Sequence, residues 1–296
     1  MNQTTQLKFN NFRVQAMSTI LPSHFFKNII ALFVLIFGWL NQQVDILSTP
    51  VLRDIFLALY FTYKRHLEDP FHGLITARPE LFQNGHIFDI GSNVGFTVSL
   101  FASVASAGYQ VHAFEPEPKN FALLKRVVRK KKISLKVCVN RFAVGNNTGD
   151  VQLRINRRHH GDHRVHNATT QPLNIFNSLI SVPSTTIDDY WKSLPEPRKV
   201  AFVKIDVQGF EPAVIQGMQA LLKAQEDVIV ALEFAPEDSR SLGFSSELVF
   251  SVLNSWKGRI VYTLNKGGQL HRMENLNSSN YPESLNLLIA PETLLI

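Results

Sequence analysis

The chain has 296 residues, of which 45% are apolar and 18% are charged, and its formal net charge is +6. This composition excludes a chain that is disordered as a whole, and the length allows one large α/β domain with an extension. Cys138 is the one cysteine of the sequence, so an internal disulfide and a cysteine-built zinc site are both excluded.

The positive charge is concentrated in two short segments. Much of the excess lies in residues 125–132 (KRVVRKKK), and Arg157, Arg158 and Arg164 form a second group. The first segment is expected to end a helix, where cations are favourable beside the helix dipole. The sequence shows no basic stripe with interleaved aromatic residues, so nucleic acid is not expected as a partner.

Residues 1–80 are expected to form a helical extension before the main domain, residues 81–296. Residues 1–27 contain three lysines or arginines and no acid, and the apolar segment 28–41 (NIIALFVLIFGWLN) follows them. Its apolar run is shorter than the roughly 20 residues that span a bilayer, and no small-residue cleavage site follows it. We expect this segment to be a helix that lies on a membrane or packs on the main domain. A second helix is expected over 51–63.

The stretch 87–95 (IFDIGSNVG) predicts a cofactor-binding loop. A short apolar strand containing Asp89 leads to Gly91 and Gly95, and a helix is predicted over 96–106. Glycines permit a tight strand-to-helix turn and let a ligand approach the main chain. The spacing D-x-G-x-x-x-G differs from the dinucleotide fingerprint G-x-G-x-x-G, and a carboxylate at the strand end suits the ammonium group of an amino acid. S-adenosylmethionine has such a group.

The next apolar run, 110–116 (QVHAFEP), places Glu115 at the end of a second strand. An acid in this position is placed to accept hydrogen bonds from both hydroxyls of a ribose. A helix is predicted over 119–130 and a strand over 134–144, so that Phe142 and Ala143 would cover one face of an adenine ring. A further strand is predicted over 148–156.

The loop 157–166 (RRHHGDHRVH) contains four histidines and one aspartate. Imidazole and carboxylate groups suit a divalent metal ion, but no regular spacing orients these side chains, so a metal site is not expected. An exposed loop is the simpler interpretation. A third interpretation places the loop over the ligand edge, where Asp162, His163 and Arg164 would face the substrate.

A second block of chemical interest is 200–211 (VAFVKIDVQGFE). A buried strand over 200–205 leads to Asp206 and Gly209, and Glu211 begins a helix predicted to run through residue 222. Because ligands bind at the carboxyl ends of the strands in an open α/β sheet, Asp206 and Asp89 are expected to face one crevice.

The C-terminal region predicts an amphipathic helix and the last three strands of a seven-stranded sheet. The final two strands are expected to form an antiparallel hairpin. The helix is predicted over 245–256 and the strands over 227–234, 259–264 and 285–290.

Five motifs in this order resemble the FkbM-type methyltransferases, a branch of the class I S-adenosylmethionine-dependent enzymes. The motifs are DIGSNVG, AFEPEPKNFALL, AVGNNTGDVQL, TTIDDY and VKIDVQGFEPAVIQGMQALL. The resemblance covers residues 82–291. It implies a Rossmann-like three-layer α/β sandwich whose seven-stranded, mostly parallel sheet has an antiparallel last strand. It also implies O-methylation of a hydroxyl on a sugar, a glycan or a secondary metabolite.

The resemblance also implies which residues bind the cofactor. Asp89 and the residues up to Gly95 match the loop beside the methionine moiety, with Ser92 where alanine is commoner, and Glu115 matches the ribose ligand. The family signature after the fourth parallel strand corresponds to Asp206, Gly209 and Glu211. The expected contacts to S-adenosylmethionine are Asp89, Gly91, Ser92, Asn93, Gly95, Glu115, Pro116, Phe142, Ala143 and Asp206.

Methyl transfer to a hydroxyl needs an in-line approach, a pocket with little water and a general base. The candidate catalytic residues are Asp206, His163 and Glu211, with Glu233 as a further supporting group. Asp206 could instead hold a turn or contact the amino acid of the cofactor. Glu211 could equally be a charge stabilised at a helix N-terminus.

Two other classes of protein share part of this pattern. A nicotinamide-dependent oxidoreductase has the strand, glycine turn and terminal acid, but the glycine spacing and the IDVQGFE block count against it. A non-catalytic membrane-associated binding protein is the second, and the three intact acids count against that. The expected partners are a small-molecule or glycan acceptor and, through 28–41, a membrane surface. Because S-adenosylmethionine is made in the cytosol, a cytoplasmic location is expected.

Overall fold

The computed structural model describes residues 49–156, 163–166, 177–196, 198–245, 248–249, 251–252, 256, 258–273 and 284–293. The chain divides into two compact units, Met1–Asp69 and Pro70–Ile296. The segment 28–41 and most of the predicted helix 245–256 lie outside the described residues. Among the residues that the structure describes, no helix is long and apolar enough to cross a bilayer.

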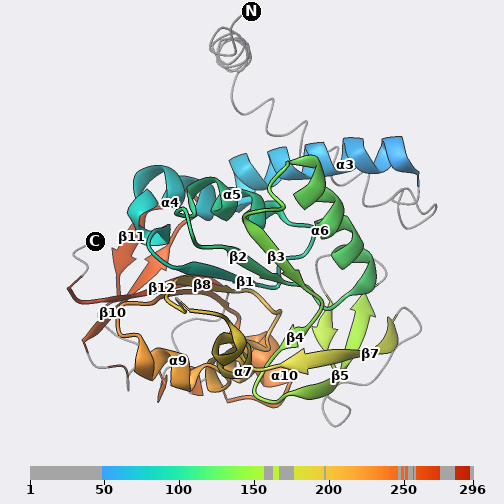
Figure 1. Cartoon of the computed structure of the whole chain (residues 1–296). Helices are drawn as coiled ribbons and strands as arrows, with labels where there is room; N and C mark the ends of the chain where they lie inside the picture. The colour runs from blue at the N-terminus through green and yellow to red at the C-terminus, as the bar shows by residue number, and fades with distance from the viewer. Residues whose placement is uncertain are drawn as a thin grey trace, which may run out of the picture. The chain divides into compact units, whose positions relative to one another are not determined.

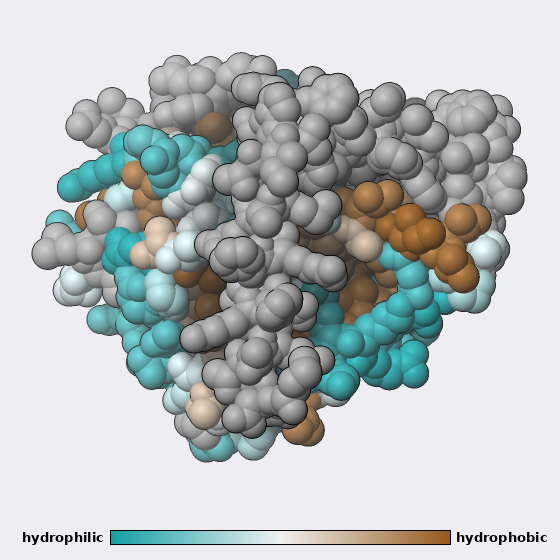
Figure 2. Space-filling view, turned by 90° about the horizontal axis from the view of Figure 1, so that it is seen from above, coloured by the Kyte–Doolittle hydropathy of each residue, from teal (hydrophilic) through white to brown (hydrophobic). Residues whose placement is uncertain are grey.

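The described part of the first unit is helical, as the sequence predicts for 51–63. Helix α3 (Pro50–Tyr63) continues into a single π-helical turn, η2 (Lys64–Glu68). A proline in the first turn of α3 suits a helix start, because its missing N–H would have no partner there. Val51, Leu52 and Ile55 are exposed on α3. Figure 2 shows that hydrophobic and hydrophilic residues occur side by side on the face that it views.

The second unit is built on an eight-stranded sheet with the order β11-β10-β12-β9-β8-β1-β2-β3 (Figure 1). Its central strands β9, β8, β1, β2 and β3 are parallel, and β12 is antiparallel to both β9 and β10. The strands are β1 (His86–Ile90), β2 (Val111–Phe114), β3 (Val137–Asn140), β8 (Val200–Ile205), β9 (Ile229–Phe234), β10 (Arg259–Leu264), β11 (Leu270–Arg272) and β12 (Leu285–Pro291).

Helices cover both faces of this sheet, which gives the three-layer α/β arrangement expected from the sequence. Figure 1 shows α4, α5 and α6 on one side and α7, α9 and α10 on the other. These helices, with η3 and α8, are α4 (Phe71–Ala77), η3 (Pro79–Phe82), α5 (Phe96–Val104), α6 (Pro118–Lys130), α7 (Ile187–Ser193), α8 (Glu211–Gln216), α9 (Gln219–Ala224) and α10 (Pro236–Ser241). The expectation of a mostly parallel sheet with a reversed last strand is confirmed.

Burial of the central strands explains their apolar sequence. Every residue of β1, β2 and β8 is buried, as in strands covered on both faces. Phe88 and Ile90 belong to the core shared with the helices after β8. On the other face, Phe82 and Phe202 pack with ring centroids 4.4 Å apart, and Phe71 contacts Phe202 at 6.2 Å.

The second unit also contains a smaller sheet with the order β4-β7-β5-β6. The predicted strand 148–156 belongs to it. Its strands are β4 (Ala143–Val144), β5 (Gly149–Asn156), β6 (Arg164–Val165) and β7 (Asn177–Thr185). Figure 1 shows β4, β5 and β7 beside the end of β3. This sheet therefore lies next to the carboxyl edge of the main sheet.

Four details of the sequence-based assignment are corrected. The predicted strand 134–144 is interrupted at 141–142, because its last two residues pair with β7 in the small sheet. The predicted helix 211–222 is two helices, α8 and α9. Strand β11, which pairs with β10, raises the main sheet from seven strands to eight. The last two predicted strands, β10 and β12, pair antiparallel as expected. They are not a simple hairpin, because β11 lies between them in the sequence and β12 also pairs with β9.

The predicted domain boundary at 80/81 falls inside the second compact unit. Helix α4 precedes this boundary and contacts α5, which follows it. The turn η3 spans the boundary and contacts α5 and β8. Phe71 of α4 and Phe82 of η3 are both buried. Residues 70–80 thus belong with the main sheet in the structure.

Candidate active site

The turn between β1 and α5 is shaped by left-handed backbone conformations. Gly91 has φ +77°, Asn93 φ +47° and Gly95 φ +90°. A Cβ on Gly91 would lie 1.8 Å from the carbonyl oxygen of Asp206, so this glycine lets the turn touch the end of β8. The hydroxyl of Ser92 donates to the carbonyl of Asp89 at 2.7 Å. The close approach of Gly91 to Asp206 joins the predicted cofactor loop, 87–95, to the block 200–211.

Glu115 joins the same turn to the end of β2. Its Oε2 accepts a hydrogen bond from the backbone N–H of Asn93, and its Oε1 accepts one from the N–H of Glu117, both at 2.9 Å. The side chain is buried, and burial raises the pKa of Glu115 to about 8, although the backbone donors act to lower it. The carboxylate lies at a cavity and retains lone pairs for a further donor.

A buried ammonium group connects the ends of β1 and β8. Lys204 Nζ lies 3.3 Å from carboxylate oxygens of both Asp89 and Asp206, and it donates to the carbonyl of Gly91 at 2.9 Å. Burial by itself would lower the pKa of Lys204, but the charges of Asp206 and Asp89 raise it above the ordinary value. The sequence analysis did not identify Lys204, although a lysine inside an apolar strand was the available signal.

Asp89 is fully buried beneath the turn. It accepts a hydrogen bond from the hydroxyl of Thr97 in α5 and faces Lys204. Burial raises the pKa of Asp89, and the charge of Lys204 opposes this effect. Asp89 is not among the residues that line the cavity. Its predicted direct contact with the ammonium group of the cofactor is therefore not supported by its position, because Lys204 and Thr97 occupy its surroundings.

Glu211 holds the loop that follows β8. Its Oε1 accepts hydrogen bonds from the N–H groups of Val207 at 2.9 Å and Gly209 at 3.3 Å, where Gln208 has φ +55° and Gly209 φ +98°. The residue is 1% exposed, and burial raises the pKa of Glu211 to about 8. The buried position of Glu211 suits a residue that holds the loop in place. It does not suit a residue that touches a substrate.

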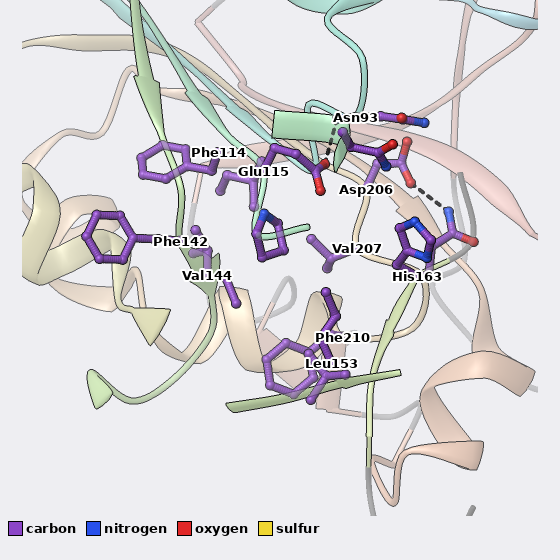
Figure 3. A pocket seen from close by; sticks show the side chains of 17 residues that line it. Asn93, Phe114, Glu115, Phe142, Val144, Leu153, His163, Asp206, Val207 and Phe210 are labelled. Carbon is purple, nitrogen blue, oxygen red and sulfur yellow. Dashed lines mark hydrogen bonds between the residues drawn. The ribbon is translucent and has the colours of Figure 1, made fainter. Parts of the chain in front are cut away.

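A cavity that is partly open to solvent lies at the carboxyl ends of β1, β2 and β8. Glu115, Asn93 and Asp206 lie on one side of the cavity, and Phe210 and Leu153 lie on the other (Figure 3). Asp206 is one-third exposed and accepts a hydrogen bond from Gln208 Nε2 at 2.9 Å.

The cavity brings together most of the residues predicted from the sequence. Gly91, Asn93, Glu115, Pro116, Phe142, Ala143, His163 and Asp206 all line it. Asp89, Ser92, Gly95 and Glu211 do not line it. The sequence analysis missed several apolar or neutral lining residues, among them Leu153, Val165, Val207, Gln208 and Phe210.

His163 enters the cavity from the small sheet. Its Nδ1 accepts a hydrogen bond from the N–H of Asn156 at 3.2 Å. Arg164 pairs instead with Asp238 of α10, so its predicted role toward a substrate is not supported by its position. Asp162 lies outside the described residues. Within the part of the chain that the structure describes, no three His, Cys, Asp or Glu side chains are grouped to hold a metal ion.

The residues around the cavity fit S-adenosylmethionine. The Oδ1 of Asn93 is buried at the cavity and accepts no hydrogen bond from the described residues, as expected of a group that awaits a ligand donor. The Glu115 carboxylate could accept hydrogen bonds from ribose hydroxyls, and Phe114 and Phe142 offer apolar surface. The cavity thus offers Glu115 and the phenylalanine rings to the nucleoside of S-adenosylmethionine, and Asn93 to its amino acid.

The model of the FkbM methyltransferase domain matches residues 89–256 of the chain. The chain belongs to the FkbM methyltransferase family. It is therefore an S-adenosylmethionine-dependent methyltransferase, and S-adenosylmethionine is its cofactor. The matched region begins at Asp89 and includes Glu115, Asp206 and Glu211.

Solved methyltransferase structures are similar at low sequence identity. The FkbM methyltransferase of Methylobacillus flagellatus KT aligns with TM-score 0.47 and 16% identity over 78% of this chain, which spans about half (53%) of that protein. An O-methyltransferase of Bacillus cereus in complex with SAH aligns with TM-score 0.44 and 12% identity over 75% of this chain and 81% of its own.

The O-methyltransferase TomG of Streptomyces achromogenes, in complex with SAM, aligns with TM-score 0.45 and 10% identity over 75% of this chain and 80% of its own. No curated protein sequence matches the chain. The assignment to the family thus rests on the family model and agrees with the topology of the sheet.

Proposed function

We propose that this methyltransferase methylates a hydroxyl oxygen of a small hydroxylated acceptor such as a sugar or a secondary metabolite. The observation that carries the proposal is the two-sided cavity. Asp206, Gln208 and His163 supply polar groups for hydroxyls, whereas Leu153 and Phe210 supply an apolar wall for a ring. This combination suits a compact acceptor that has a hydroxyl edge and an apolar face.

In this proposal the chain's own residues position the acceptor and accept its proton. The bound cofactor supplies an electrophilic methyl group on a sulfonium. Asp206 accepts the hydroxyl proton as the new O–CH₃ bond forms and the S–CH₃ bond breaks. Lys204, 3.3 Å away, pairs with the Asp206 carboxylate and orients it, and Glu211 fixes the loop on which it lies. His163 faces the same space and is the alternative base.

Glu115 is proposed to bind the ribose, and Asn93 to contact the methionine moiety. Calorimetry with S-adenosylmethionine tests this step. We expect the wild type to bind and Glu115→Ala to weaken binding by about tenfold or more, because the hydrogen bonds to two hydroxyls are lost. Binding of nicotinamide dinucleotides is not expected. If neither protein binds S-adenosylmethionine, the proposed site is wrong.

The proposed base is tested by the formation of S-adenosylhomocysteine with a panel of sugars and phenols. Asp206→Asn should reduce turnover by about 100-fold or more while the affinity for S-adenosylmethionine stays within about threefold. His163→Asn should retain most of the turnover. The reverse result would assign the base to His163. Turnover with nucleic acid alone and with none of the small acceptors would overturn the proposed acceptor class.

A further inference from the structure

The turn between α6 and β3 exposes a cluster of cations around one apolar side chain. We call this cluster the basic tip and define it as Arg129, Lys130, Lys131, Lys132, Leu135 and Lys136. All six residues are exposed, and Leu135 is 93% exposed. The tip lies in the second unit, where α6 leads into β3 at the edge of the main sheet (Figure 1).

The charge at this corner of the molecule stands apart from the rest of the chain. Residues 119–141 contain nine of the 30 lysines and arginines and none of the 24 aspartates and glutamates. The other residues thus have 21 basic and 24 acidic side chains, so their formal charge is negative. Residues 119–141, which cover nearly all of α6, the tip and β3, thus contribute more positive charge than the net charge of the whole protein.

The requirements of a helix end do not explain the tip. Cations in the last turn of α6, such as Arg129 and Lys130, are favourable beside the dipole. Lys136 Nζ donates to the carbonyl of Ala102 in the last turn of α5 at 3.1 Å. However, Lys132 lies beyond α6, and the dipole gives no reason to expose Leu135. A leucine that contacts almost nothing in its own protein is available to insert into another medium.

The backbone presents this leucine on an ordered turn. Lys132 N donates to Arg129 O at 3.0 Å, Ile133 N to Val128 O at 3.1 Å, and Lys136 N to Ile133 O at 2.9 Å. Ile133 is half-buried, whereas the side chain of Leu135 is exposed. The apolar group is therefore held in place before any partner arrives, which lowers the entropic cost of binding.

We propose that the basic tip docks this protein on a bilayer that contains anionic phospholipids. Lysine and arginine side chains near such a surface are attracted to the lipid headgroups, and one apolar side chain can insert between them. A nucleic acid surface would instead favour exposed aromatic rings or a basic groove. The one aromatic ring of α6, Phe121, lies under the ammonium group of Lys125 and is not fully exposed.

The position of the basic tip determines the orientation of the docked enzyme relative to the bilayer. The cavity lies at the carboxyl ends of β1, β2 and β8, whereas the tip precedes the first residue of β3, which runs parallel to them. The tip and the cavity are thus at opposite edges of the sheet. Docking would leave the cavity open to an acceptor that approaches from the aqueous side.

Vesicle sedimentation of the full chain tests the proposal. We expect binding to be about tenfold tighter on phosphatidylcholine vesicles with about 30% phosphatidylglycerol than on phosphatidylcholine alone, and to weaken with added salt. Comparing the two lipids removes any contribution of the hydrophobic segment 28–41 that does not depend on charge. Lys130→Glu, Lys131→Glu and Lys132→Glu combined should abolish the preference for anionic vesicles. Leu135→Ser should weaken binding by about threefold on anionic vesicles.

A matched triple variant controls for net charge. Lys192→Glu, Lys223→Glu and Lys266→Glu change the same charge at exposed sites outside the tip and should leave the lipid preference intact. Circular dichroism and binding of S-adenosylmethionine verify that each variant is folded. The proposal is overturned if the wild type shows no preference for anionic vesicles, or if both triple variants lose it equally. It is also overturned if an RNA oligonucleotide binds the tip while the vesicles do not.

Discussion

Lys204 is the single residue on which the geometry of the site depends most. It is 4% exposed and lies between two carboxylates from the ends of different strands. Removing one member of a buried charge cluster leaves the others uncompensated, at a cost of about 3–5 kcal/mol. Lys204→Met should therefore lower the free energy of unfolding by this amount, as measured by urea denaturation, and should reduce affinity for S-adenosylmethionine.

A surface ion pair provides the control for this variant. Lys199 lies 2.7 Å from Asp227, but its side chain is 46% exposed. Lys199→Met should cost only about 0–1 kcal/mol, because exposed pairs contribute little. Equal effects of the two substitutions would contradict the role assigned to Lys204.

The two glutamates with raised pKa values make stability depend on pH. Burial raises the pKa of both Glu115 and Glu211 to about 8, from 4.5 for an ordinary glutamate. Between these values the folded chain keeps protons that the unfolded chain has released. The free energy of unfolding should therefore fall as the pH rises from about 5 to about 8. Glu115→Gln should reduce this fall when urea titrations are compared at pH 5 and pH 8.

The comparison needs a variant of an exposed carboxyl group. Glu237→Gln on α10 should leave the pH dependence unchanged, because this side chain is 72% exposed. A fall in stability that is equally steep in Glu115→Gln and in the wild type would show that Glu115 titrates normally in the folded protein.

At the scale of elements, the site depends on the contact between two loops. The β1–α5 turn and the β8–α8 loop meet where Gly91 faces the carbonyl of Asp206. Gly91→Ala should displace this carbonyl and weaken binding of S-adenosylmethionine by about tenfold or more, as measured by calorimetry. Gly108 also has a positive φ, but nothing lies within 4 Å of a Cβ placed there.

Gly108→Ala separates backbone strain from steric overlap. It should cost about 1–2 kcal/mol of stability for the left-handed conformation and leave cofactor affinity unchanged. If both variants bind S-adenosylmethionine as tightly as the wild type, the contact between the two loops is not needed for the site.

The break between α8 and α9 shows why helix boundaries were mispredicted. Asp188 of α7 accepts hydrogen bonds from the N–H groups of Ala220 and Leu221, both at 2.8 Å, in the first turn of α9. It thereby satisfies donors that a continuous helix would satisfy internally. Gly217 lies at the break, where a Cβ would be 2.0 Å from the carbonyl of Gly145. Both partners are distant in sequence, so local pattern could not reveal the break.

At the scale of the whole molecule, the second unit is expected to fold by itself from residue 70. Phe71 and Phe82 precede β1 but pack with Phe101 and Phe202 in one aromatic cluster. A fragment of residues 70–296 should therefore unfold cooperatively and bind S-adenosylmethionine. A fragment of residues 83–296 lacks both rings and should be destabilised by several kcal/mol, because each lost phenylalanine costs about 3–5 kcal/mol.

Thermal denaturation and calorimetry of the two fragments measure this difference. Equal stability of the fragments would instead favour the boundary at 80/81 that the sequence predicts. Failure of both to fold would mean that residues before 70 are required.

The sequence by itself determined the succession of the central strands along the chain, the loop motifs and the family. Buried parallel strands are apolar on both faces, and here acids and glycines follow the ends of these strands. Both features are local patterns that the sequence alone reveals. For this reason Glu115 and Asp206 could be predicted to meet at one edge. The tertiary structure alone decided that Asp89 is covered and paired with Lys204, and that Glu211 holds a loop. The position of Asp89 depends on a contact with Lys204, more than 100 positions away, which no local pattern encodes. The role of Glu211 depends on its burial and on the fold of the loop whose N–H groups donate to it.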